Sequence, residues 1–244
     1  MNRLTLEQAE NLAAKMRGML NATGVEPLST KTIVRQLNIM TVFRPLSESL
    51  WGLSLKSPDG KGRFILVNSN STRGCQHFTI AHELFHLYFD VNPEPHFSGS
   101  EFNANPSERS ANMFASALLM PRAGICNVIP NNELISKNIS VDTVLRLESL
   151  FGVSHTTMVL RLKELSLIAN GCADRLSGIS ITREAALRGY DGRLYQPAHN
   201  EGLVIGDFGS MAKMLYDREK ISEGHYLELL NMIGYGEEED SSGC

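Results

Sequence analysis

The segment His82-Glu83-Leu84-Phe85-His86 constrains the fold of this chain more than any other feature. Positions i and i+4 lie one above the other on an α-helix, so a helix through this segment directs both imidazoles to the same side. Glu83 follows the first histidine directly, where its carboxylate can take a proton from a water activated by a metal. The pattern therefore predicts a metal-binding helix with His82 and His86 as ligands and Glu83 as a general base.

A catalytic zinc site usually has three protein ligands and one water, so the two histidines need a third partner. The best candidate is Glu108, in the first turn of the next predicted helix. Three side chains remain alternatives: Asp90, one helical turn past His86, and His96 and Glu101 in the loop that follows.

Two further roles near the metal are open at this point. Asn112 is four residues after Glu108 on the same helix face, where it can hydrogen-bond to a ligand histidine and fix its tautomer. An Asn at this position can equally satisfy a buried backbone group. A group that stabilises a tetrahedral oxyanion is also expected, and the nearby candidates are Tyr88, His77 and His96.

The composition is that of an ordinary soluble globular protein, with 42% hydrophobic and 20% charged residues in a chain of 244. No apolar run approaches the ~20 residues of a membrane span, and Met1 is followed by a polar amphipathic segment rather than a signal peptide. The four cysteines (Cys75, Cys126, Cys172 and Cys244) form no CxxC pair. We therefore expect a cytoplasmic protein with reduced thiols, and a buried Cys75.

Apolar periodicity and turn residues predict an α+β fold. Helices are expected over residues 6–20 and 29–37, followed by a small antiparallel sheet built from residues 39–44, 50–55 and 63–68. The metal helix should run over residues 72–90. After a loop rich in Asn, Ser and Gly, Ser107 is expected to cap a helix that stops before Pro121.

The organisation changes after residue 130. We expect a metallopeptidase-like core over residues 1–130, a helix-turn-helix-like segment over 131–170, and a region over 171–244 that ends in a disordered acidic tail, Glu237-Glu238-Glu239-Asp240. The middle segment has balanced charge, and the net charge of the chain is −4. No basic stripe is present, so direct nucleic-acid binding is disfavoured and a packing or substrate-docking role is preferred.

Two segments resemble signatures of the ImmA/IrrE metallo-endopeptidase family. The first comprises Arg73 and the run Phe78-Thr79-Ile80-Ala81-His82-Glu83-Leu84. The second runs from Glu108 through Ala111-Asn112 and Phe114-Ala115 to Pro121. The upstream helix pair, Trp51-Gly52 and residues 63–68 also follow the layout of the family, so the resemblance covers roughly residues 5–130. Phe85 stands where a glycine is common before the second histidine.

The resemblance implies a compact zincin-like core with one Zn²⁺ held by His82, His86 and Glu108, although such a site also accepts Mn²⁺. It further implies a zinc metallo-endopeptidase with Glu83 as the catalytic residue. The implied substrate and partner is a DNA-binding repressor protein whose cleavage switches on gene expression. The alternative is a non-catalytic binding module, an anti-repressor or toxin–antitoxin component that grips a partner through the zinc fold.

Overall fold

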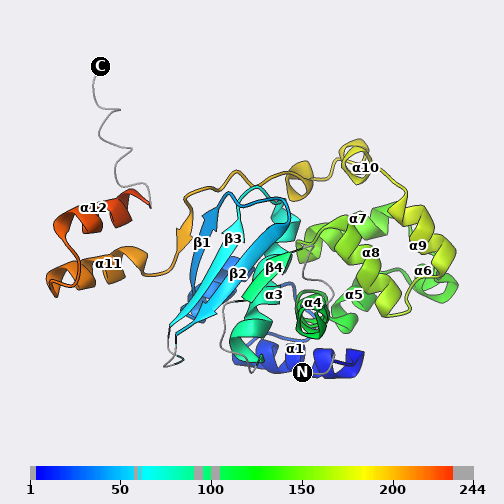
Figure 1. The fold of residues 1–244 in the computed structure, drawn as a ribbon. Helices are drawn as coiled ribbons and strands as arrows, with labels where there is room; N and C mark the ends of the chain where they lie inside the picture. The colour runs from blue at the N-terminus through cyan, green and yellow to red at the C-terminus, as the bar shows by residue number, and fades with distance from the viewer. Residues whose placement is uncertain (1–3, 58–59, 61, 91–95, 100–104, 233–244) are drawn as a thin grey trace, which may run out of the picture.

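A five-stranded sheet flanked by helices forms the centre of the computed structural model, which describes residues 4–57, 60, 62–90, 96–99 and 105–232 (Figure 1). The order of strands across the sheet is β4-β2-β3-β1-β5. The strands are β1 (Met40–Arg44), β2 (Leu50–Lys56), β3 (Arg63–Asn68), β4 (His96–Gly99) and β5 (Val204–Ile205). The α+β class expected from the sequence is confirmed.

The sheet is mixed, so the prediction of an antiparallel sheet was wrong. β2 pairs with β3 in the antiparallel sense, but β1 runs parallel to β3. The chain leaves β1, passes β3 to form β2 and then returns between the two strands. Asn68 holds this crossing, because its Nδ2 donates to the carbonyls of Ser47 and Leu50 (3.0 and 2.9 Å) and its Oδ1 accepts from the Leu46 amide (3.1 Å).

Two strands come from outside the segment where strands were expected. β4 lies in the stretch predicted to be loop, and it pairs with β2 at one edge of the sheet. His96 therefore belongs to a strand rather than to a loop. β5 arrives from the C-terminal part and pairs with β1 at the opposite edge, with Thr41 opposite Ile205.

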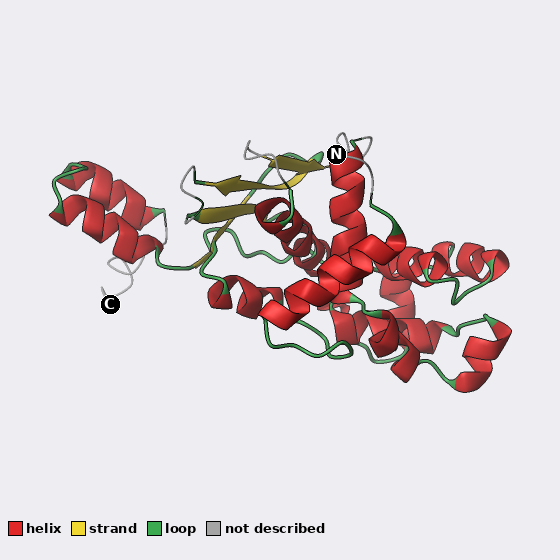
Figure 2. Cartoon of the chain, turned by 90° about the horizontal axis from the view of Figure 1, so that it is seen from below, coloured by secondary structure: helices red, strands yellow, loops and turns green. Residues whose placement is uncertain are grey.

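Helices α1 (Leu6–Met19), α3 (Arg73–Tyr88) and α4 (Pro106–Leu119) are stacked beside the sheet (Figure 2). α3 lies against β2 and β3, α4 contacts the other side of α3, and α1 contacts α4. The core between these helices contains the fully buried side chains of Leu84, Phe85 and Phe114. Phe85 occupies this core with its ring 5.8 Å from that of Phe114, which explains why a large side chain is accommodated in the middle of the histidine pair.

Close approach of α3 to the sheet depends on Gly52 in β2. A Cβ at this position would lie 2.7 Å from both the Leu66 carbonyl oxygen and the Thr79 Cγ2. Such distances are shorter than van der Waals contact, so a larger residue would push α3 away from the strand. Gly52 therefore sets the depth at which the histidine-bearing helix is seated.

The start of α4 corrects one sequence expectation. Asn105, not Ser107, is the N-cap, and its side chain accepts a hydrogen bond from the Ser107 amide (2.9 Å). Pro106 occupies the first helical position, where its fixed φ favours helix initiation and its missing N–H costs nothing. The Ser107 hydroxyl is thereby left for another partner.

The remaining described helices lie between α1 and β1 or after α4 along the chain. They are α2 (Thr30–Gln36), α5 (Arg122–Val128), α6 (Asn131–Ser136), α7 (Val141–Phe151), α8 (His155–Glu164), α9 (Asn170–Ser177), α10 (Ile181–Leu187), a 3-10 helix (Gly192–Tyr195), α11 (Phe208–Asp217) and α12 (Glu223–Asn231). α11 and α12 form a hairpin that stands apart from the other helices (Figure 1). The predicted acidic tail lies outside the described residues. Among the described helices, none has the length and apolar character needed to cross a membrane.

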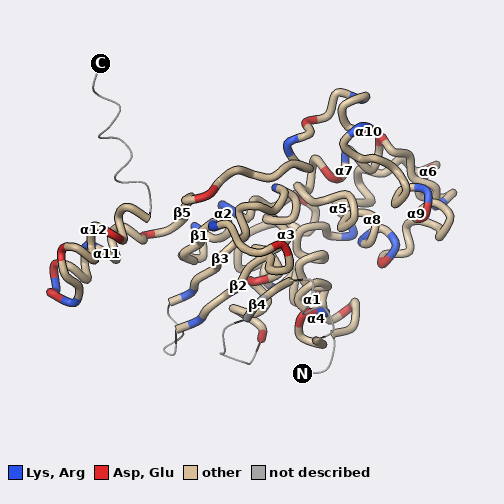
Figure 3. Tube along the Cα trace, turned by 45° about the horizontal axis from the view of Figure 1, so that its top comes forward, with Lys and Arg blue, Asp and Glu red and all other residues tan. Residues whose placement is uncertain are grey.

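The two helices predicted in the helix-turn-helix-like segment are present as α7 and α8, and both contribute to the core. Arg161 on α8 is buried, donates from Nε to the Met120 carbonyl (3.1 Å) and pairs with Glu10 and Glu164. Acidic and basic positions are interspersed over this part of the chain (Figure 3). Arg161, one of the few basic residues of this segment, is thus committed to packing. The predicted domain boundary near residue 130 stays a prediction. The apolar core extends across this position and includes Leu176 and Ile205.

Candidate metal centre

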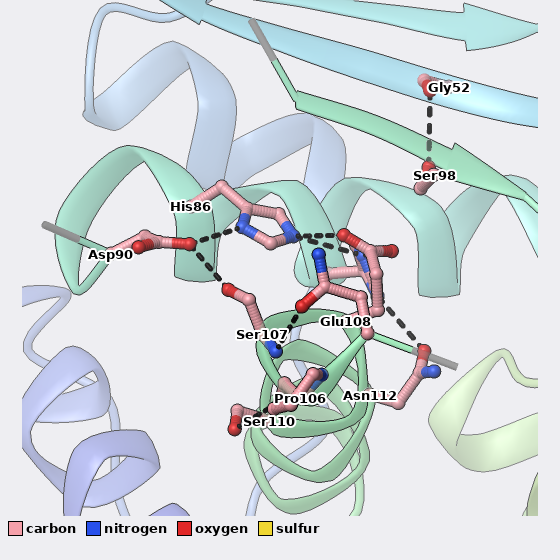
Figure 4. Close-up of polar contacts among 11 residues, drawn as sticks. Gly52, His86, Asp90, Ser98, Pro106, Ser107, Glu108, Ser110 and Asn112 are labelled. Atoms are coloured by element: carbon pink, nitrogen blue, oxygen red, sulfur yellow. Dashed lines mark hydrogen bonds and ion pairs between the residues drawn. The ribbon is translucent and has the colours of Figure 1, made fainter. Parts of the chain in front are cut away.

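Three buried side chains from two helices converge on one point. His82 and His86 project from α3. Glu108 projects from the first turn of α4 toward His86 (Figure 4). The His82 Nε2 lies 3.1 Å from the Glu108 Oε2, and the His86 Nε2 lies 3.2 Å from the Glu108 Oε1. The two Nε2 atoms are 3.2 Å apart, and one ligand atom from each residue lies within 4.8 Å of the others. The cluster is buried, with no more than 5% of any of these residues exposed.

The local sequence explains this convergence. Thr72 caps α3 by accepting from the Cys75 amide, and the helix then places His82 and His86 one turn apart on the side that faces α4. Apolar residues of α4 such as Phe114 and Leu118 pack into the core and fix the helix against α3. Glu108 near the N-terminus of α4 also benefits from the positive end of the helix dipole.

The alternatives for a third ligand differ in what the structure says about them. The Asp90 carboxylate is directed at the Nδ1 of His86, on the side of the ring away from the cluster, at 3.1 Å. His96 is part of β4, but the orientation of its side chain is not described. Glu101 lies outside the described residues. Among the described residues, the group of potential ligands is therefore His82, His86 and Glu108.

The donor set fits a zinc ion. Two imidazole nitrogens and one carboxylate form a common ligand combination for catalytic zinc. The two Nε2 atoms face each other and the Glu108 oxygens at distances that a shared cation would satisfy. Burial on its own lowers the pKa of His82, but the hydrogen bond to Glu108 and the negative charges of Glu83 and Glu108 together raise it above its usual value. The two carboxylates thus give the site a negative charge, which favours the binding of a cation.

Each ligand histidine has a hydrogen-bond partner on its second ring nitrogen. The Asn112 Oδ1 lies 2.9 Å from the His82 Nδ1, which is one of the two roles that the sequence left open for this residue. Because the amide oxygen can only accept, it holds the proton of His82 on Nδ1 and leaves the Nε2 lone pair facing the cluster. The Asp90 contact does the same for His86, and this role of Asp90 was missed by sequence reasoning. The available signal was the i,i+4 spacing of the two residues.

Glu83 is fully buried beside the cluster, and neither carboxylate oxygen has a hydrogen-bond partner among the described residues. An unpaired buried carboxylate is costly, and such groups are typical of functional positions. This isolation is consistent with a base that keeps its lone pairs available for a proton. The role of Glu83 itself stays a prediction.

Two candidates for oxyanion stabilisation have other contacts. The His77 ring lies between the Gly152 carbonyl at Nδ1 (2.9 Å) and the Leu28 carbonyl at Nε2 (3.0 Å), and burial lowers the pKa of this histidine. Tyr88 stacks beneath the Arg63 guanidinium, whose carbon lies 4.5 Å from the ring centroid. His77 and Tyr88 therefore have structural contacts on other sides of α3. Cys75 is exposed rather than buried, which corrects the expectation for this residue.

The segment before the histidine pair anchors α3. A Cβ on Gly74 would lie 2.7 Å from the Ser154 amide nitrogen, so a glycine allows the helix to touch the turn between α7 and α8. Gln76 and Asn200 exchange two side-chain hydrogen bonds of 3.0 Å. Asn200 belongs to a strap, residues 196–205, whose Ala198 amide donates to the Ser71 carbonyl (3.3 Å). The strap holds the beginning of α3 against the sheet.

Comparison with models of known protein families gives a match that includes the metal centre. The model of the Peptidase_M78 family, described as the IrrE N-terminal-like domain, matches residues 34–163. This span covers more than half of the chain and includes the histidine pair, Glu83 and Glu108. No curated protein matches the sequence.

Proposed function

The chain belongs to the Peptidase_M78 family, and from this premise we propose that it is a zinc-dependent endopeptidase with a zincin-like core. The observation that carries the proposal is the convergence of the buried His82, His86 and Glu108 beside a buried carboxylate, Glu83, that has no partner among the described residues. A family name alone indicates a peptidase, and this donor set favours a metal-dependent one.

The chain's own residues account for the proton transfers of amide hydrolysis. When bound, zinc supplies a Lewis acid that polarises the scissile carbonyl and lowers the pKa of water to about 7. Glu83 accepts a proton from the attacking water as the new carbon–oxygen bond forms. The same carboxyl then gives this proton to the leaving nitrogen as the carbon–nitrogen bond breaks. Asn112 and Asp90 keep the two imidazoles in the tautomer that points Nε2 at the cation.

We infer that the substrate is a cytoplasmic regulatory protein, a DNA-binding repressor whose cleavage switches on gene expression. Support comes from the resemblance to ImmA/IrrE endopeptidases. An excess of acidic over basic residues after Gly171 adds to it, because DNA-binding repressors carry basic surfaces.

The first experiment measures metal content by mass spectrometry on three purified proteins: wild type, Glu108→Ala and Glu83→Gln. We expect one zinc per chain in the wild type and in Glu83→Gln, and loss of zinc from Glu108→Ala, because Glu108 is a proposed ligand and Glu83 is not. A wild type that stays metal-free when zinc is supplied would contradict the proposal.

The second experiment separates an endopeptidase from a binding module. A reporter gene under a repressor of the host is followed in cells that express wild type or Glu83→Gln. We expect relief of repression, together with repressor fragments, only for the wild type. If Glu83→Gln relieves repression equally and leaves the repressor intact, the non-catalytic binding module is the correct function.

A further inference from the structure

We propose that Asp90, held by Ser107, is a positioning residue that sets the orientation and donor strength of His86 as a metal ligand. This inference rests on the proposed zinc site and assigns a role to two residues outside the ligand set. Figure 4 shows the chain of contacts from Ser107 through Asp90 to the ring of His86.

The Asp90 carboxylate contacts both His86 and Ser107. One oxygen of Asp90, Oδ2, lies 3.1 Å from the His86 Nδ1 and accepts a hydrogen bond of 2.5 Å from the Ser107 hydroxyl. The carboxylate can only accept from the ring, so the proton of His86 is held on Nδ1 and the Nε2 lone pair points at Glu108. Ser107 fixes the carboxylate in turn, because its hydroxyl is not used as a helix cap.

Asp90 occupies a position at the end of α3 where a carboxylate is disfavoured. Asp90 follows directly after α3, with its amide bonded to the Phe85 carbonyl, so its carboxylate lies at the negative end of the helix dipole. A carboxylate is disfavoured there, and burial adds to the cost: the Asp90 side chain is only 4% exposed. The contacts of Asp90 with His86 and Ser107 offset this unfavourable free energy.

The two histidines are supported unequally. His82 is backed by a neutral amide, Asn112, whereas His86 is backed by a carboxylate. A negative charge behind the ring makes the opposite nitrogen a stronger donor, so His86 is the ligand whose bond to the metal depends most on its support. The first turn of α4 acts on both sides of His86: Glu108 lies at Nε2, and Ser107 holds Asp90, which follows α3 and lies at Nδ1.

The test is a titration of the full-length, metal-free protein with Zn²⁺ in competition with a chromophoric chelator. Asp90→Asn keeps the shape of the side chain and removes its charge, and we expect its zinc dissociation constant to rise about 10- to 100-fold. Ser107→Ala should shift the constant in the same direction by less. Asp217→Asn is the matched control, because this exposed aspartate makes an i,i+4 pair with Lys213 away from the site, and it should bind zinc like the wild type.

A second readout separates positioning from a general loss of stability. With Co²⁺ in place of zinc, the d–d absorption reports the ligand field, and Asp90→Asn should change the intensity and position of these bands. If Asp90→Asn keeps the wild-type dissociation constant and Co²⁺ spectrum, the inference is wrong even when the melting temperature falls. A wild type that binds neither ion would overturn both this inference and the proposed function, whereas a variant equal to a metal-binding wild type overturns the inference alone.

Discussion

At the scale of single residues, Glu83 illustrates the cost of a functional group in a buried place. Its two carboxylate oxygens have no hydrogen-bond partner among the described residues, and the residue is fully buried. Replacement by Gln removes the charge and keeps the volume. We therefore expect metal-free Glu83→Gln to unfold at a higher temperature than metal-free wild type, by about 2–4 °C if the gain is about 1 kcal/mol.

This prediction is checked by calorimetry on both proteins after metal removal. Peptide hydrolysis should be lost in the same variant, so stability and activity change in opposite directions. Glu164→Gln is a suitable control, because Glu164 is partly exposed and forms an ion pair with Arg161. It should lower the melting temperature or leave it unchanged. A Glu83→Gln protein less stable than the wild type would show that the carboxylate contributes to the fold.

The residues of the site were predictable only as far as local spacing reaches. The i,i+4 histidine pair and the carboxylate directly after its first member predict His82, His86 and Glu83 from sequence, and the periodic helix after residue 105 predicts Glu108. The contact from Ser107 to Asp90 joins residues from two helices, and no local pattern encodes it. Asp90 was considered only as a ligand, and Ser107 only as a cap, because both of those roles have local signals.

At the scale of elements, Gly52 determines how closely α3 approaches β2. Gly52→Ala would place its Cβ 2.7 Å from the Leu66 carbonyl and from Thr79, so we expect a loss of about 1–3 kcal/mol in the free energy of unfolding. Gly18→Ala is the matched control: Gly18 lies near the end of α1 with no atom within 4 Å of a Cβ, and this change should stabilise by about 0.5–1 kcal/mol. Urea unfolding measures both, and equal effects of the two changes would contradict the assigned role of Gly52.

A buried ion pair links α7, α8 and α9. Both ring nitrogens of His155 face acceptors, the Glu148 carboxylate at 2.6 Å and the Leu176 carbonyl at 2.8 Å. Tyr195 donates to the other Glu148 oxygen (2.6 Å). Two acceptors favour the doubly protonated ring. Burial alone would lower the pKa of His155, but these bonds and the charge of Glu148 raise it above the ordinary 6.5.

This shift has a predictable sign. Because the folded-state pKa exceeds that of the unfolded chain, the stabilisation is fully present below pH 6.5 and is lost as the pH rises through the folded-state pKa. We expect the free energy of unfolding to fall over this window in the wild type, and to fall less in His155→Asn. Denaturant unfolding at a series of pH values checks the difference between the two proteins, since other titrating groups are common to both. Parallel pH profiles would contradict the assignment.

At the scale of the whole molecule, the part of the chain after the family match divides into two portions with different roles. Leu176 and Ile205 are buried in the core, and β5 pairs with β1. In the hairpin of α11 and α12, by contrast, most side chains are exposed, and the rings of Tyr216 and Tyr226 stack on each other at 4.9 Å. The portion through β5 completes the core, and the hairpin after it adds little to it.

Two truncations test this division. A chain of residues 1–206 should unfold at nearly the same denaturant concentration as the full chain. A chain of residues 1–163 should fail to fold, because it loses several core side chains worth about 2–5 kcal/mol each, against a total stability of only about 5–15 kcal/mol. Circular dichroism and one-dimensional NMR distinguish the two. A folded 1–163 chain would show that the strap is dispensable.

The fold was predictable in its local elements and less so in its assembly. Capping residues and periodicity predicted α1, α3, α7 and α8 because these signals lie within each helix. β4 escaped prediction because its four residues lie in a stretch dominated by turn formers, and β5 because two residues carry no periodicity. The parallel pairing of β1 with β3 depends on the crossing held by Asn68, which is a contact between distant residues.

The strap also imposes an order in time. The predicted ligands and Asn112 have all been synthesised before residue 113, but Gln76 meets its partner only when Asn200 emerges. At about 5–20 residues per second, this takes on the order of ten seconds more. A growing chain therefore contains every predicted ligand of the metal centre well before the fastening of α3 is complete. Because a chain of residues 1–163 is not expected to fold, the ligands are made early but reach their folded positions only when the later segments, the strap included, have emerged.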